Sequence, residues 1–96
     1  MTSEEKAQMV VDVMTATNVL NKLQLRIMLE LHLVSDLMVH ELAKIADVSA
    51  PAISRSVDEL EKLGYVKRIR DEKEDRRRVY VTLTNKGSKF VEGALA

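Results

Sequence analysis

Three consecutive arginines, Arg76, Arg77 and Arg78, stand in a charged run between two stretches typical of β-strands. A guanidinium group is permanently charged, planar and weakly hydrated, so it suits phosphate oxygens and the narrow, negative minor groove of DNA. Asp75 directly precedes the arginines, and we expect it to hold one of them in a local ion pair that shapes the segment without adding affinity. A charged hairpin alone is more often a solvated turn, so this reading needs support from elsewhere in the chain.

That support comes from a helix predicted over about residues 50–63. Ser49 is a good N-cap, Pro51 fits the first turn, and Gly64 is a natural residue to follow the helix end. Apolar residues recur from Ile53 at the spacing of one narrow buried stripe, and the opposite face is small and polar. Small residues allow close approach to a groove, while Ser and Arg can contact base edges or phosphates. The predicted contact residues of this helix are Ser49, Ala50, Pro51, Ala52, Ser54 and Arg55.

The charge distribution agrees with a polyanionic partner, although the formal net charge is zero. Residues 1–61 carry five Lys or Arg and ten Asp or Glu, a net charge of −5. Residues 62–89 carry ten Lys or Arg and four Asp or Glu, a net charge of +6. Such a chain can present a positive face to phosphate while remaining neutral overall.

Catalytic and metal chemistry find no support in the sequence. The chain has no cysteine, which excludes disulfides, thiolate zinc sites and thiol nucleophiles. Its two histidines, His32 and His40, have no ligand set around them, and three glycines could hardly build a phosphate-binding loop. We therefore expect no enzyme, no metal and no cofactor.

The location of the protein is also suggested by the sequence. The first residues lack the basic-then-apolar layout of a signal peptide, and charges interrupt every apolar stretch before it could span a membrane. We expect a protein of the reducing cytoplasm without a membrane partner.

Four further elements must position these surfaces. The periodicity predicts helices over about residues 4–16, 22–33 and 39–46, and a last helix that begins near residue 84. Asn21 and Gln24 have the spacing of a capping box for the second helix. The helix at 39–46 lacks an adjacent Ser or Thr cap, and Asp36 is the candidate in its place.

After Gly64 the period changes to two, which predicts an antiparallel hairpin of strands 65–70 and 79–83 with a charged tip. The expected fold class is mainly α with a small antiparallel β-hairpin, the winged helix-turn-helix. We expect a single domain over residues 1–96, with an N-terminal helix in 1–20, a winged-helix core in 21–90 and a wing over 65–83. In such folds the recognition helix enters the major groove.

At this point the chain resembles the MarR (multiple antibiotic resistance regulator) family of transcriptional regulators. The resemblance covers residues 21–90, and each matching stretch alone is weak, whereas their order and spacing together are specific. The matching stretches are residues 24–29, 41–43, 48–61, 64–68, 75–77 and 83–87.

The resemblance implies a homodimer on pseudo-palindromic double-stranded DNA, with residues 49–55 in the major groove and the wing in the minor groove. Arg77, two residues after Asp75, would be the minor-groove residue. The chain has only a short segment after Gly87, where the family's dimerisation helix continues for several turns.

Dimerisation is therefore expected to use the N-terminal helix. This helix has two apolar faces, and the second needs a cover, either a partner chain or a domain that wraps the helix deeply. We favour a partner chain. The predicted interface residues are Met9, Val13, Ala16, Phe90, Val91 and Leu95.

Together these features predict a sequence-specific DNA-binding regulator, most simply a repressor that occupies a promoter. The alternative is a winged helix that binds another protein, and an apolar or acidic recognition face would have favoured it. The residues specify no operator and no effector.

Overall fold

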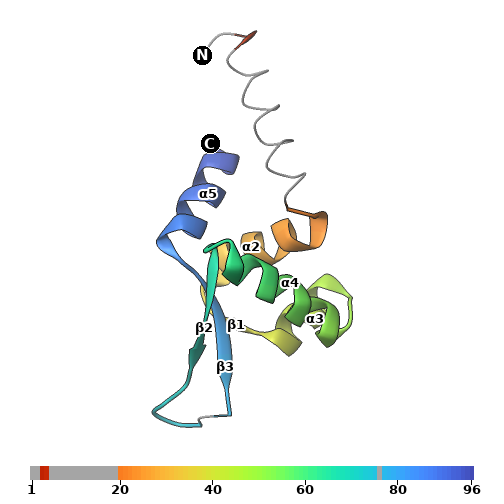
Figure 1. The fold of residues 1–96 in the computed structure, drawn as a ribbon, viewed down its shortest axis with the longest axis vertical. Helices are drawn as coiled ribbons and strands as arrows, with labels where there is room; N and C mark the ends of the chain where they lie inside the picture. The colour runs from red at the N-terminus through yellow and green to blue at the C-terminus, as the bar shows by residue number, and fades with distance from the viewer. Residues whose placement is uncertain (1–2, 5–19, 76) are drawn as a thin grey trace.

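A computed structural model describes residues 3–4, 20–75 and 77–96 of the chain (Figure 1). The elements that follow residue 20 are α2 (Lys22–Val34), β1 (Leu37–Met38), α3 (Val39–Ala46), α4 (Ala50–Lys62), β2 (Val66–Arg70), β3 (Val79–Leu83) and α5 (Asn85–Leu95). The helices gather at one end of the sheet and the β2–β3 hairpin projects beyond them (Figure 1). The predicted winged helix-turn-helix fold, mainly α with a small antiparallel sheet, is confirmed. Most of the helix predicted over 4–16 lies outside the described residues.

The start of α2 is fixed by the predicted capping box. The side-chain oxygen of Asn21 accepts a hydrogen bond from the Gln24 N–H at 2.9 Å, and the Gln24 side chain accepts one from the Asn21 N–H at 2.9 Å. Two N–H groups that have no partner within the helix are thus satisfied. The helix ends at Ser35, whose φ of 75° turns the chain toward β1.

The start of α3 differs from the prediction. Asp36 is exposed and does not cap the helix; Met38 holds the N-cap position, and its N–H donates to the Glu41 carboxylate at 2.9 Å. The prediction was wrong because Leu37 and Met38 form a short strand, which delays the helix beyond the reach of Asp36.

A tight turn joins α3 to α4. Asp47 adopts a left-handed conformation (φ 55°, ψ 49°), which a short polar side chain tolerates better than most. The Val48 N–H then donates to the Ala43 carbonyl at 3.1 Å, which closes the end of α3. Ser49, the next residue, is the N-cap of α4, so the connection between the two helices is very short.

The sheet has three strands in the order β1-β3-β2, and both pairs are antiparallel. The hairpin of β2 and β3 was predicted, but β1 was not. In the register Leu37 and Arg68 both lie opposite Val81, from the two sides of β3. We call the segment from β2 to β3, residues 66–83, the wing.

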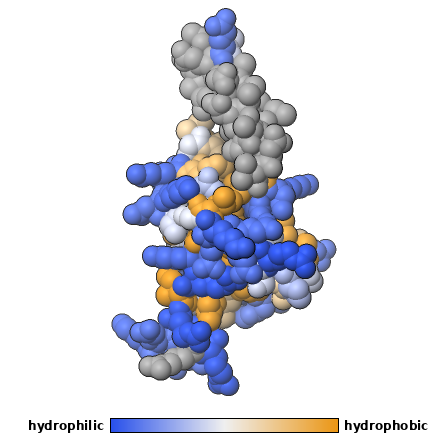
Figure 2. All heavy atoms as spheres, in the orientation of Figure 1, coloured by the Kyte–Doolittle hydropathy of each residue, from blue (hydrophilic) through white to orange (hydrophobic). Residues whose placement is uncertain are grey.

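One hydrophobic core holds the helices to the base of the wing. It includes Ile27 and Met28 of α2, Ile53 and Val57 of α4, and Val81 of β3, each at most 1% exposed. Figure 2 shows the opposite character at the tip of the wing, where the described residues are strongly hydrophilic. The core therefore supports α4 and the wing from beneath and leaves the wing tip to solvent.

The end of α4 is bonded to the start of α5. Gly64 takes a φ of 83°, which an L side chain rarely adopts. Its carbonyl accepts a hydrogen bond from the Thr84 hydroxyl at 2.5 Å, and the Lys86 ammonium donates to the Leu63 carbonyl at 2.7 Å. Thr84 also caps α5 by accepting from the Gly87 N–H at 3.1 Å. The carbonyls of the two residues that follow α4 thus find their partners in the N-cap and first turn of α5.

Candidate nucleic-acid interface

The N-terminal half of α4 presents the small polar face that the sequence predicts. Ser49, Ala50, Pro51 and Arg55 are exposed, and Ala52 is half-buried. The Ser49 hydroxyl oxygen accepts the Ala52 N–H at 3.2 Å as the N-cap. Its own O–H remains a donor, so the cap and a phosphate contact are chemically compatible.

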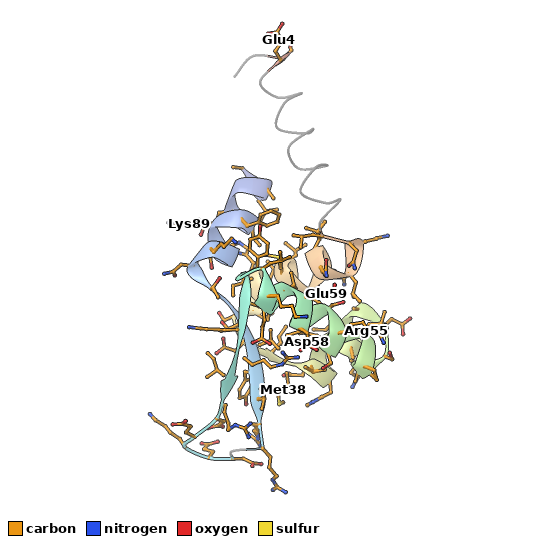
Figure 3. All side chains as sticks on the ribbon, viewed as in Figure 1. Glu4, Met38, Arg55, Asp58, Glu59 and Lys89 are labelled. Atoms are coloured by element: carbon orange, nitrogen blue, oxygen red, sulfur yellow. The ribbon has the colours of Figure 1, made fainter. Side chains whose placement is uncertain are left out.

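Arg55 is the cation of this face. It makes no ion pair with any other residue in the described ranges. In Figure 3 Arg55 lies on α4 farther from the wing strands than Asp58 does. Its guanidinium is therefore available for a ligand that approaches the outer side of the helix.

Ser54, also a predicted contact residue, lies on the flank of α4 that faces β2. The Arg68 Nη2 atom is 3.3 Å from the Ser54 carbonyl oxygen and 3.5 Å from its hydroxyl oxygen. The same guanidinium forms ion pairs with Asp58, at 2.8 Å, and with Glu61. Sequence reasoning counted Arg68 only as a strand cation, because no local spacing reveals which helix a strand residue will meet.

The tip of the wing is shaped by Asp75. Its carboxylate accepts the Arg77 N–H at 2.9 Å and lies 3.3 Å from the Arg77 Nε atom. The backbone N–H and the side chain of Arg77, in that order, hold the pKa of Asp75 below its usual value of 3.8. The Arg77 side chain is nonetheless 92% exposed, so the ion pair orients it without covering it. Arg78 is exposed, and Arg76 lies outside the described residues.

A second aspartate orders the other side of the tip, and sequence reasoning missed it. The Asp71 carboxylate accepts the N–H groups of Lys73 and Glu74, both at 3.1 Å. The Asp71 N–H donates to the Arg78 carbonyl at 2.9 Å, which closes the loop. The available signal was an Asp followed by charged residues after a strand, a common turn pattern.

A buried polar contact ties α2 to α4. The Gln24 side chain is 2% exposed, and its amide nitrogen donates a hydrogen bond to the Glu59 carboxylate. The Gln24 amide oxygen accepts a hydrogen bond in the capping box, so both the oxygen and the nitrogen of this amide are hydrogen-bonded. The sequence predicted the capping box but gave no sign of the contact with Glu59.

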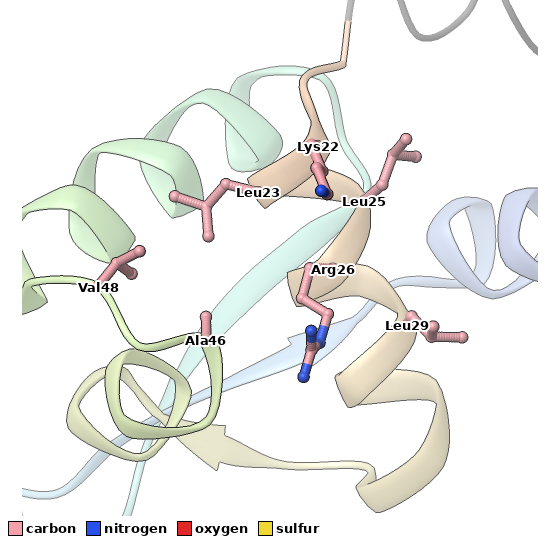
Figure 4. A pocket seen from close by; sticks show the side chains of 7 residues that line it. All are labelled: Lys22, Leu23, Leu25, Arg26, Leu29, Ala46 and Val48. Carbon is pink, nitrogen blue, oxygen red and sulfur yellow. The ribbon is translucent and has the colours of Figure 1, made fainter.

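An open apolar pocket of about 500 Å³ lies between α2 and the turn after α3 (Figure 4). Its lining residues are Lys22, Leu23, Leu25, Arg26, Leu29, Ala46 and Val48. The Arg26 guanidinium is paired with Glu30 at 2.8 Å. None of the predicted contact residues of α4 or the wing lines this pocket, so it is separate from the surface described above.

The predicted interface residues separate into three groups. Three of them, at positions 9, 13 and 16, lie outside the described residues. Val91 is 5% exposed in the core of the domain itself, and Phe90 packs on Tyr65 with ring centroids 5.0 Å apart. Leu95, at 61% exposure, is the most exposed of the described members, and with Phe90 and Val91 it lines an open apolar pocket.

Metal ligands do not gather in the part of the chain that the structure describes. No group of three or more His, Cys, Asp or Glu side chains could hold an ion there. No helix among the same residues is long and apolar enough to cross a membrane.

Comparison with known proteins decides the family. The family model of the MarR family matches residues 11–78, more than half of the chain. The chain belongs to the MarR family. It therefore has the winged-helix DNA-binding fold of these transcriptional regulators, as the sequence resemblance predicted.

Solved structures agree with the MarR assignment. The transcriptional regulator PA4135 is 30% identical, with a TM-score of 0.74 over 96% of this chain and 68% of that protein. The MepR-like protein solved with pseudoligands is 33% identical, with a TM-score of 0.77 over 96% of this chain and 63% of that protein. A mutant of MarR from E. coli complexed with operator DNA is 24% identical, with a TM-score of 0.74 over 93% of this chain and 62% of that protein.

The MarR-family chain is shorter than these structures. It spans 58% of the length of the transcriptional regulator Tm0710 from Thermotoga maritima, which is 24% identical over 88% of this chain with a TM-score of 0.79. No curated protein sequence matches the chain.

Proposed function

We propose that this MarR-family protein is a sequence-specific regulator that binds double-stranded DNA as a homodimer. In this proposal α4 enters the major groove and the wing enters the adjacent minor groove. Ser49 to Ala52 allow close approach, Arg55 contacts bases, and Arg77 inserts into the minor groove with Arg76 and Arg78 beside it. The protein acts through binding and not through catalysis.

The observation that carries the proposal is the presence of two exposed surfaces on one domain. One is the small polar face of α4 with Arg55, and the other is the wing tip with Arg77 held by Asp75. Arginine is the residue most often used both for guanine in the major groove and for a narrow minor groove. The excess of positive charge after residue 62 favours the same polyanionic partner.

Selection of bound duplexes from a random DNA pool, followed by affinity measurements at several salt concentrations, tests the proposal. We expect a pseudo-palindromic site whose half-sites are about 10 bp apart. If about six phosphates are contacted, affinity should fall by about three orders of magnitude between ~50 and ~200 mM salt. No enrichment together with a flat salt response would favour a protein-interaction module instead.

The homodimer is supported by the N-terminal sequence. Met9, Val13 and Ala16 share a surplus apolar face when placed on a helix, and a partner chain would cover it. Val13→Glu should produce a folded monomer with greatly weakened DNA binding. Sedimentation beside circular dichroism measures this: a mutant that remains dimeric contradicts the interface, and loss of helicity assigns Val13 to the core.

Repression is the proposed mode of regulation. A dimer on a promoter excludes polymerase, and the neighbour from E. coli was solved with operator DNA. In transcription from a template that carries the selected site, added protein should lower the transcript in proportion to occupancy. A rise in transcript would make the protein an activator.

A further inference from the structure

One side chain joins the base of the wing to the proposed recognition helix. Arg68 lies opposite Val81 in the register and two residues after Val66, and both of these valines are buried. Because side chains alternate along a strand, Arg68 projects from the same face of β2 as Val66. Its side chain is 26% exposed and reaches α4.

The contacts of Arg68 follow one stripe of α4. Ser54, Asp58 and Glu61 are spaced at i, i+4 and i+7, so they lie on one side of the helix. The Nη1 atom forms both ion pairs, with Asp58 at 2.8 Å and with Glu61. The Nη2 atom reaches the Ser54 carbonyl at 3.3 Å. The guanidinium thus engages about two turns of helix.

The chemistry of this contact requires arginine. A planar guanidinium has several N–H donors in fixed directions, whereas the lysine ammonium is a single flexible point charge. Two carboxylates compensate the one positive charge of Arg68, so it is ill-suited to hold a phosphate. Its role must therefore lie within the protein.

The other polar contacts described for α4 lie at its C-terminal end, where Leu63 and Gly64 are bonded to Lys86 and Thr84, or on another element. The hydrogen bond between Gln24 and Glu59 joins α4 to α2, and α2 is not part of the wing. Asp71 and Asp75 order the wing tip only within itself. Arg68 connects the middle of α4 directly to a wing strand.

We propose that Arg68 is a positioning residue that fixes the wing relative to α4, so that major-groove and minor-groove contacts are made in one register. This inference rests on the proposed DNA-binding function. A specific site requires both elements to be placed together, whereas non-specific binding needs only charge near the backbone. Arg68 therefore contributes to discrimination between sequences and contributes little to affinity for any duplex.

Binding assays with Arg68→Ala and the control Lys67→Ala test this role. The Lys67→Ala substitution also removes one positive charge, from the residue next to Arg68 on β2. The Lys67 side chain lies on the opposite face of that strand. Arg68→Ala should weaken binding to the selected site about tenfold relative to a scrambled duplex, with the salt slope unchanged. Lys67→Ala should keep that ratio. An equal loss on both duplexes with a slope lower by about one would make Arg68 a phosphate contact and overturn the proposal.

Arg68→Ala also leaves the carboxylates of Asp58 and Glu61 without their positive partner. A second variant is therefore needed to distinguish the effect of this added negative charge from the loss of the link between the wing and α4. Arg68→Ala combined with Asp58→Asn and Glu61→Gln removes the extra negative charge but cannot restore the link. The ratio between the two duplexes should remain about tenfold lower than in the wild type. Recovery of the wild-type ratio would mean that Arg68 acts only by masking charge. Arg68→Lys should recover little, because lysine lacks the planar fork.

A measurement without DNA distinguishes failure of the positioning role from failure of the proposed function. The chain has no cysteine, so Lys62→Cys and Glu74→Cys place spin labels at the end of α4 and on the wing tip alone. With excess unlabelled protein, the distance distribution should be narrow and should broaden on Arg68→Ala but not on Lys67→Ala. Equal widths would overturn the positioning role. Failure of the wild type to bind any duplex would refute the proposed function alone.

Discussion

Gly87 packs directly against the backbone of Tyr65. A Cβ atom added at Gly87 would stand 2.0 Å from the Tyr65 carbonyl oxygen and 3.0 Å from its carbonyl carbon. That oxygen also accepts the Thr84 N–H at 3.0 Å, so the Tyr65 backbone is held in place. Gly87 is thus required by the contact between α5 and the residue that leads into the wing.

Gly87→Ala should therefore destabilise the domain strongly. The backbone of Tyr65 cannot yield as a flexible side chain would, and overpacking of this kind costs about 1–3 kcal/mol or more in the free energy of unfolding. Gly93→Ala is the matched control in the same helix, because nothing lies within 4 Å of its added Cβ. That change should stabilise by about 0.5–1 kcal/mol. Urea denaturation measures both, and similar effects would contradict the packing described.

The two exposed arginines should separate by role. Arg55→Ala should relax the preference at particular positions of the selected site, by about 1–3 kcal/mol, because it removes a proposed base contact. Arg77→Ala should instead weaken binding and alter the preference for A·T-rich flanks. Lys22→Ala on α2 is the control and should do little. If Arg77→Ala and Lys22→Ala both left the DNA affinity unchanged, the wing would not contact DNA.

Ser49 offers a test that separates helix capping from DNA contact. Ser49→Ala should lower stability by about 1 kcal/mol, because the Ala52 N–H loses its acceptor. Ser49→Asp keeps a good cap, so stability should return to near the wild-type value. The new carboxylate would face phosphate, and DNA affinity should fall below that of Ser49→Ala. Thermal unfolding and DNA titration measure the two effects, and restored affinity in Ser49→Asp would place Ser49 away from DNA.

The ion pair at the wing tip should survive throughout the neutral range. The lowered pKa of Asp75 means that its carboxylate favours the folded wing above the unfolded pKa, and that this contribution is lost only as the pH falls through the lower folded value. NMR titration of the Asp75 carboxyl carbon should therefore give a midpoint below 3.8. Arg77→Ala should raise the midpoint only in part, since the backbone N–H of residue 77 remains. A wild-type midpoint at or above 3.8 would contradict the geometry.

Zinc and peroxide should leave DNA binding unchanged. The chain has no cysteine, and His32 and His40 are both exposed without a cluster of acids among the described residues. Affinity measured with micromolar zinc, with chelator and after mild peroxide treatment should agree. A zinc-dependent gain that vanished in the His32→Ala, His40→Ala double variant would reveal a metal switch.

Local chemistry made much of this fold predictable from the sequence. The recognition helix was predicted over about 50–63 and is observed at Ala50–Lys62, because Ser49 and Gly64 act on their immediate neighbours. The Asn21–Gln24 capping box and the β2–β3 hairpin are local in the same sense. The ion pair between Asp75 and Arg77 needs only two residues of separation.

What could not be predicted depends on residues far apart in the sequence. Leu37 and Met38 form a strand only because β3 lies beside them, and two apolar residues before a helix carry no strand signal of their own. Arg68 meets α4, and Gln24 meets Glu59, only after the elements have packed. Gly87 carries no helical or strand signal either, since its role is to leave room for Tyr65.

The two-residue strand β1 has a consequence for how the domain comes apart. Met38 pairs with Tyr80 of the wing and is also the N-cap of α3, so one residue belongs to both substructures. If the first turn of α3 unfolds, the sheet loses the pairing of β1 with β3. If β1 separates from β3, α3 loses its N-cap residue. Such shared residues merge neighbouring segments into one cooperative unit. Native-state hydrogen exchange should then find that the amides of α3 and β3 open together, with similar free energies of opening.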